Sequence, residues 1–213
     1  MNIIDSFFEY FGLALIIINT FLYIRSYKTY KNELTYRLFS LYLLCSVVIN
    51  IGVFVLAAYK EHNLFLSHYY FILQFVILSL FYRELFNTVQ KRMVNILFIP
   101  VLVTLCIQFA ISPELYFKFN TNEVFITCFP IVIYSVIHLY NSLSKLSKYM
   151  YINAGILIYL TTSTLIFILG DYLSGSNSGA VNNIWFINKV LYTIYLLLIF
   201  IEWWKNYRLI KNK

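Results

Sequence analysis

Long apolar runs alternate with short polar segments along the whole chain. A helix that crosses a bilayer needs about 20 mostly apolar residues, and seven stretches meet this requirement. They cover Ile3–Ile24, Leu38–Ala58, Phe65–Tyr82, Met93–Ile111, Glu123–Tyr140, Tyr151–Gly170 and Ile184–Trp204. The runs do not alternate polar with apolar side chains, as the strands of membrane barrels do. The pattern therefore predicts an all-α integral membrane protein, a bundle of seven transmembrane helices.

The connections between these stretches leave no room for a water-soluble domain. None of them exceeds 13 residues, so we expect residues 1–213 to form a single polytopic domain. The first stretch is expected to remain in the membrane as an anchor. Its leader MNIID carries no cation, and its apolar run is longer than the core of a signal peptide. Any functional site must then lie inside the bundle or at one of its two ends.

The composition agrees with this class. Of the 213 residues, 61% are hydrophobic and only 12% are charged, and the mean hydropathy is +0.75. A soluble domain carries about 25% charged residues, so an ordinary soluble enzyme, a disordered chain and a disulfide-rich secreted module are excluded. The richness in Ile, Lys, Asn, Tyr and Phe suggests an AT-rich bacterial genome. We expect a multi-pass protein of the bacterial inner membrane.

The positive charges are distributed unevenly among the connections. Of the 16 Lys and Arg residues, 13 fall after the first, third and fifth stretches and in the C-terminal tail. The opposite side holds only Lys60, Lys118 and Lys189, the last of them near the start of the seventh stretch. Cytoplasmic loops carry the Lys and Arg excess, so we expect the N-terminus outside, the C-terminus in the cytoplasm and a basic cytoplasmic rim. Such a rim contacts anionic lipid headgroups and can also dock an acidic protein.

Three polar residues are predicted at similar depth near the middle of the membrane. Asn50, Gln74 and Thr164 lie on the polar faces of the second, third and sixth stretches. Polar groups avoid lipid, so these side chains should point into the bundle. They can form hydrogen bonds between helices, or they can line a small binding pocket. Both interpretations remain open from the sequence.

Four titratable residues are predicted at a shared depth near the outer ends of their helices: Glu9, His68, Glu123 and Asp171. One histidine and three carboxylates can hold a metal or perform acid–base chemistry. However, the chain has neither an HExxH motif nor paired histidines, and nucleotide-binding glycine motifs are also missing. We therefore expect these four residues to be structural anchors. We predict no catalytic, cofactor-binding or metal-binding residues.

Two resemblances suggest alternative functions. The topology resembles that of small sugar carriers with three-plus-one-plus-three helices, but the Pro-Gln dipeptide typical of that family is missing. The segment LIFILGDYLSG at Leu165–Gly175 is similar to a helix end of membrane lysoplasmalogenases, which use two intramembrane aspartates. Asp171 corresponds to one of them, whereas Asp5, the only other aspartate, lies at the N-terminus. A small-solute carrier and an intramembrane lipid hydrolase are thus the alternatives.

A third resemblance gives the favoured interpretation. The runs SHYYFILQFVILSLFYREL, INAGILIYLTTSTLIFILGDYL and NNIWFINKVLYTIYLLLIFIEWWKN resemble a broad group of small multi-span bacterial proteins. One role in that group is the membrane accessory of type VI-B CRISPR defence, which modulates an RNA-guided RNA nuclease. This implies a non-enzymatic accessory or regulator with a cytoplasmic protein partner, docked on rim residues such as Arg83, Lys91 and Arg92. We expect no direct nucleic-acid binding, because no RNA-recognition or helix-turn-helix pattern occurs.

Overall fold

A computed structural model describes residues 3–144, 148–173 and 178–208, and side chains for most of these. Throughout this part of the chain the structure is helical, with no strand. The long helices are α1 (Ile3–Tyr30), α2 (Leu34–Ala58), α3 (Phe65–Leu85), α4 (Thr88–Ile111), α5 (Thr121–Ser144), α6 (Met150–Leu173) and α7 (Ser178–Glu202). A 3-10 helix, η1 (Pro113–Phe117), follows α4, and a π-helix, η2 (Trp203–Tyr207), continues α7. All seven long helices are long and apolar enough to span a membrane, which confirms the predicted fold class.

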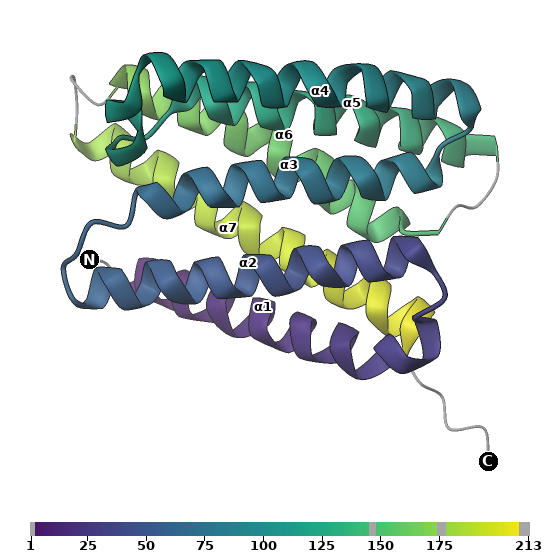
Figure 1. The fold of residues 1–213 in the computed structure, drawn as a ribbon. Helices are drawn as coiled ribbons and strands as arrows, with labels where there is room; N and C mark the ends of the chain where they lie inside the picture. Colours follow the sequence, from purple (N-terminus) through teal and green to yellow (C-terminus); the bar gives the residue numbers. More distant parts are fainter. Residues whose placement is uncertain (1–2, 145–147, 174–177, 209–213) are drawn as a thin grey trace.

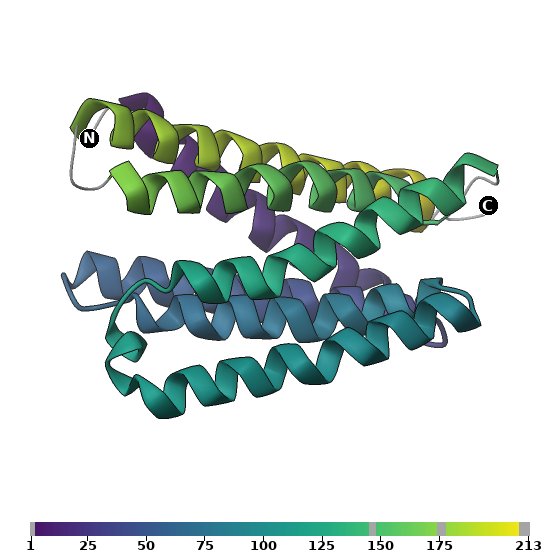
Figure 2. The ribbon, with the colours of Figure 1, turned by 90° about the horizontal axis from the view of Figure 1, so that it is seen from above.

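Six of the long helices form a closed ring, and the seventh lies outside it. Going around the ring, α1 packs on α2, α2 on α3, α3 on α5, α5 on α6, α6 on α7, and α7 returns to α1. Helix α4 packs only lightly, against α3 and α5, on the outside of the ring. Figure 1 shows α1 beginning at one end of the bundle and η2 ending at the other, and Figure 2 shows α6 and α7 running side by side.

Several helices extend beyond the apolar runs that predicted them. For example, α1 continues to Tyr30 and α4 begins at Thr88. Hydropathy marks the part of a helix inside hydrocarbon, whereas the helix itself ends where capping groups replace its hydrogen bonds. At the start of α4, Gln90 N donates to Asn87 Oδ1 (3.0 Å) and Asn87 N donates to Gln90 Oε1 (3.3 Å), a complete capping box.

The interior of the ring is filled by aromatic and aliphatic side chains and tied together by buried hydrogen bonds. Asn153 of α6 joins three helices: its Oδ1 accepts from Tyr82 Oη (2.8 Å) and from Ser135 Oγ (2.9 Å), and its Nδ2 donates to the Ser135 carbonyl (3.1 Å). Interhelical hydrogen bonds in membranes contribute about 0.6 kcal/mol each on average. Shape-matched packing therefore supplies most of the stability, and such bonds fix which faces meet.

The outside of the bundle is strongly apolar. Large side chains on the outward faces are well exposed, such as Phe21 (62%), Val48 (62%) and Ile99 (65%). Exposed apolar surface of this extent is found where a protein meets a membrane or a partner. Together with seven helices of spanning length, it identifies a multi-pass membrane protein.

The two ends of the bundle carry opposite charge. At the end where α1 and α7 finish, hereafter the basic end, the described cations are Arg25, Lys28, Lys31, Arg37, Arg83, Lys91, Arg92, Lys148, Lys205 and Arg208. At the opposite end, hereafter the acidic end, the described charged residues are Asp5, Glu9, Glu61, Glu114, Glu123, Lys60, Lys118 and Lys189. Because successive helices run in opposite directions, alternate connections lie at the same end of the bundle, and their charges are brought together there. Which end faces the cytoplasm stays a prediction.

Candidate functional site

Two of the three predicted interior residues meet at one thiol. Gln74 of α3 donates from Nε2 toward Cys128 Sγ of α5 at 3.6 Å. The hydroxyl groups of Thr127 and Thr164 lie close to this thiol, so that α3, α5 and α6 converge there, although Thr164 Oγ1 makes no hydrogen bond within the described part of the chain. The Cys128 side chain is buried, as are Gln74 and Thr164. The sequence predicts only that Gln74 and Thr164 lie at similar depth. In the structure both side chains lie beside the Cys128 thiol inside the ring.

Asn50, the third predicted interior residue, belongs to a different group of contacts. Its Nδ2 donates to the Ser46 carbonyl of its own helix at 2.8 Å, and its side chain interacts with the Tyr192 hydroxyl of α7. Asn50 and Tyr192 both line a cavity of about 200 Å³ between α1, α2 and α7. Asn50 therefore faces a cavity at the acidic end of the bundle rather than the thiol at Cys128.

A cluster of tyrosines fills the ring between these two places. Tyr195 Oη of α7 donates to Tyr42 Oη of α2 at 3.3 Å, and the Tyr159 ring of α6 stacks on the Tyr195 ring with centroids 5.4 Å apart. Gly155 makes room for this stack, since a Cβ there would lie only 2.7 Å from the Tyr195 ring. The sequence places Tyr42 and Tyr195 on polar helix faces but gives no signal that those faces meet.

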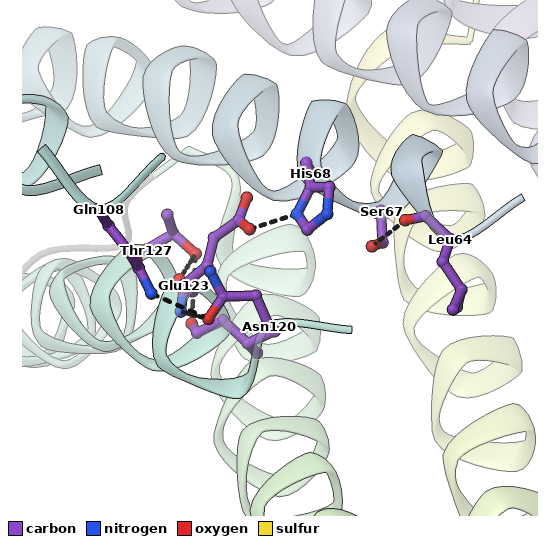
Figure 3. Close-up of polar contacts among 8 residues, drawn as sticks. Leu64, Ser67, His68, Gln108, Asn120, Glu123 and Thr127 are labelled. Atoms are coloured by element: carbon purple, nitrogen blue, oxygen red, sulfur yellow. Dashed lines mark hydrogen bonds and ion pairs between the residues drawn. The ribbon is translucent and has the colours of Figure 1, made fainter. Parts of the chain in front are cut away.

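A buried ion pair lies at the acidic end, where α3, α4 and α5 meet (Figure 3). His68 Nδ1 is 2.5 Å from Glu123 Oε2, and both side chains are buried. Asn120 precedes α5, and its Oδ1 accepts from Glu123 N (3.2 Å) and from Gln108 Nε2 (3.2 Å). Aromatic rings of Phe109 and Tyr116 flank the His68 ring. The first turn of α5, capped by Asn120, thus brings the carboxylate to the imidazole.

Within the part of the chain that the structure describes, this cluster leaves several buried polar atoms without a hydrogen bond. They are His68 Nε2, Glu123 Oε1, Asn120 Nδ2 and Gln108 Oε1. Buried polar atoms in proteins are nearly always bonded, to protein or to water. Donors and acceptors are both present, so the cluster has the chemistry to bind an ordered water molecule or a small polar group without any change in the fold.

Of the four titratable residues predicted at one depth, the structure describes the side chains of Glu9, His68 and Glu123, and of these three only His68 and Glu123 come together. Glu9 does not join His68 and Glu123; its Oε2 lies 3.0 Å from Lys189 Nζ. The side chain of Asp171 lies outside the described residues. Among the side chains that the structure does describe, no three metal-ligating groups gather at one point. The His68–Glu123 pair offers a proton-sharing dyad.

The predicted docking residues lie around the junction of α3 and α4 at the basic end. Arg83, near the end of α3, is half-buried, and its Nη1 is 3.7 Å from Glu84 Oε1. Lys91 and Arg92 follow in the first turns of α4, where Lys91 is half-buried and Arg92 is exposed. The ion pair makes Arg83 the least available of the three to an outside partner.

Glu202 has a role at the basic end that the sequence does not reveal. The side chain is fully buried at the end of α7. Its Oε1 accepts from Tyr149 N (3.1 Å) and Asn206 Nδ2 (2.6 Å), and its Oε2 accepts from Tyr151 N (3.0 Å). The carboxylate thereby caps the N-terminus of α6 from another helix, where the helix dipole favours negative charge.

Comparisons of this chain with protein-family models, curated proteins and solved structures found no match. The fold and the charge of the two ends are therefore the basis for inferring a function.

Proposed function

We propose that this protein is a non-enzymatic membrane accessory protein that binds a cytoplasmic protein partner at its basic end. The observation that carries the proposal is the charge of that end. Its ten described cations far outnumber its three acids, Glu33, Glu84 and Glu202. Of these acids, Glu202 is buried as a helix cap and Glu33 pairs with Lys148 at 3.1 Å. Most of the positive charge is thus left for a partner or for lipid.

Short connections make this charged surface compact. The α1–α2 connection spans only residues 31–33, and α3 and α4 are separated only by residues 86–87. Helix ends rather than long loops therefore present Lys28, Lys31, Arg37 and Arg92, all of which are exposed. Basic surfaces attract acidic partners over the distance of a Debye length, about 8–10 Å in physiological salt. An acidic protein surface suits this end better than an apolar one.

The orientation belongs to the same proposal. Lys and Arg are enriched in cytoplasmic loops, so the basic end faces the cytoplasm and the acidic end faces outward. The sequence resemblance suggests a partner class: the RNA-guided RNA nuclease of a type VI-B CRISPR system in a bacterial inner membrane. The protein would anchor or regulate that effector by surface contact, without chemistry of its own.

A binding assay with matched variants tests the docking surface. Replacing Arg83, Lys91 and Arg92 together by Gln should weaken binding of the nuclease–guide complex to protein in neutral-lipid nanodiscs by about tenfold at low salt, because exposed charges contribute up to about 1 kcal/mol each. The effect should shrink at high salt. The control is Lys60→Gln with Lys118→Gln, which removes cations from the acidic end. Equal losses in both variants, or none in the first, would overturn the proposal.

The carrier alternative makes a different prediction from the same fold. Transport would depend on interior polar residues, so Asn50→Leu with Gln74→Leu should abolish cellular activity while the three rim substitutions leave it intact. Both variants are compared at matched abundance in the membrane. Because charge removal can invert topology, the orientation of the rim variant is measured in the same cells.

A further inference from the structure

The cavity between α1, α2 and α7 has the size and position of a small-ligand site. Both α2 and α7 pack along α1, and they meet each other through side chains such as Tyr42 and Tyr195. Nearer the acidic end, the space between the three helices holds about 200 Å³. An engineered protein cavity of about 150 Å³ is large enough for benzene. The space therefore accommodates a compact molecule of several non-hydrogen atoms.

Charged groups mark the edge of this cavity. Lys189 Nζ of α7 lies 3.0 Å from Asp5 Oδ1 and 3.0 Å from Glu9 Oε2, both of α1. The three side chains are 28–42% exposed, so the cluster is open rather than sealed. Charges avoid hydrocarbon, which places this edge at the boundary with water. Two carboxylates and one ammonium leave one negative charge in excess.

Aromatic rings form part of the cavity wall. Phe8 and Phe54 both line the cavity, and each is held by an edge-on neighbour: Phe186 against Phe8 at 5.6 Å and Tyr10 against Phe54 at 5.9 Å. The Tyr192 ring lies at the cavity beside Gly12, where an added Cβ would be 3.6 Å from the ring. Ring faces attract cations, and the attraction is stronger where the ring and the cation are shielded from water.

The cavity also offers polar contacts beyond its charged edge. The Tyr192 hydroxyl is buried and makes no hydrogen bond in the described part of the chain, although the Asn50 amide is near enough to interact with it. A ligand hydroxyl would satisfy it. The described acids at this end outnumber the cations by five to three, and such an imbalance draws cations toward a cleft.

We propose that this cavity binds a small organic cation, an alkylammonium compound of about the size of choline. The excess carboxylate charge and the aromatic wall both select a cation. An anion would find Lys189 already held by two carboxylates. The site is independent of the docking surface proposed at the basic end, because it lies at the opposite end of the bundle.

Titration of the purified full-length protein in nanodiscs tests this site, with choline as the probe and binding followed by calorimetry. Its neutral carbon isostere, 3,3-dimethylbutanol, is the matched probe without the charge. We expect saturable binding of choline, and binding at least about fivefold weaker for the isostere. Equal binding of the two probes, or no saturable binding of choline, would overturn the proposal.

Substitutions of residues that line the cavity test whether negative charge strengthens choline binding and positive charge weakens it. Glu9→Gln and Phe54→Leu should each weaken choline binding about fivefold or more, since one removes a charge and the other a ring face. Glu114→Gln, an exposed acid at the same end but outside the cavity, is the control and should change nothing. Lys189→Gln should strengthen binding severalfold, because it frees both carboxylates. A weaker affinity in a Lys189→Gln protein that elutes as a single folded species would contradict a cation site.

Discussion

Two glutamates, one at each end of the bundle, are equally buried but differ in how many hydrogen bonds their carboxylates make. Glu202 and Glu123 are both fully buried. Both oxygens of Glu202 are occupied, by two backbone N–H groups and one amide. Glu123 has one oxygen on His68, and the other makes no hydrogen bond to any residue that the structure describes. The first carboxylate is used entirely by the fold, whereas the second retains capacity for a group from outside the chain.

The largest effect is expected at Glu202. Glu202→Ala leaves two backbone N–H groups at the start of α6 without an acceptor, and each unsatisfied buried group costs about 1–3 kcal/mol. The variant should lose about 3 kcal/mol of unfolding free energy in detergent titrations. Glu33→Ala removes a half-buried acid at the same end, whose partner Lys148 is exposed, and should cost no more than about 1 kcal/mol. Similar losses in the two variants would contradict the capping role.

Breaking the pair at the acidic end should cost somewhat less. His68→Leu leaves Glu123 buried without its partner, but the carboxyl can take up a proton instead of remaining charged, so we expect a loss of about 2 kcal/mol. The informative measurement is the double variant with Glu123→Leu, because replacing both members of a buried pair by apolar groups is often neutral. A double variant as unstable as the sum of the singles would show that this cluster is as structural as Glu202.

Substitutions of the helix caps at the two ends should have smaller effects on stability. Asn87 caps α4 at the basic end and Asn120 caps α5 at the acidic end, each through its side-chain oxygen. Asn87→Ala and Asn120→Ala should each lower stability by about 1 kcal/mol, the usual value of an N-cap. Asn120→Ala should be the costlier, because Gln108 also loses its acceptor. The reverse order in thermal unfolding would contradict that cluster's geometry.

The smallest effect is expected for an exposed ion pair. Lys148 Nζ lies 3.1 Å from Glu33 Oε2, but the lysine side chain is 67% exposed. Such pairs contribute about 0–1 kcal/mol and weaken with salt. Lys148→Gln should therefore leave the unfolding free energy almost unchanged at high salt, and a large salt-independent loss would show that this pair has a structural role.

The sequence predicts the helices better than it predicts their neighbours. Apolar length alone identifies all seven spans, because hydrocarbon requires every backbone group to be bonded within its own helix. Depth along each helix also follows from residue number, and this is why Gln74 and Thr164 meet at Cys128. Depth does not give the order of helices around the ring. Glu9 and His68 were predicted at one depth, but Glu9 contacts Lys189 on α7, whereas His68 contacts α5.

Roles that depend on contacts between distant segments could not be predicted. Glu202 reads in the sequence as an acid near the end of the last span, yet it caps α6, more than 50 residues earlier in the chain. The cavity at Asn50 likewise depends on how α2 and α7 pack on α1, and α1 and α7 are distant parts of the chain. The separation of charge between the two ends, in contrast, requires only that connections alternate between the ends of the bundle. It could therefore be predicted directly from the sequence.

Labelling of single cysteines most directly tests the central claim, that the basic end faces the cytoplasm and the acidic end faces outward. Glu61→Cys at the acidic end and Asn32→Cys at the basic end are both at exposed positions. Each is introduced where Cys45, Cys106 and Cys128 have been replaced by Ala or Ser. In intact spheroplasts, a membrane-impermeant maleimide should label the cysteine at position 61 and spare the one at position 32 until the membrane is opened. Labelling at position 32 with protection at position 61 would contradict the orientation and, with it, docking of a cytoplasmic partner at the basic end.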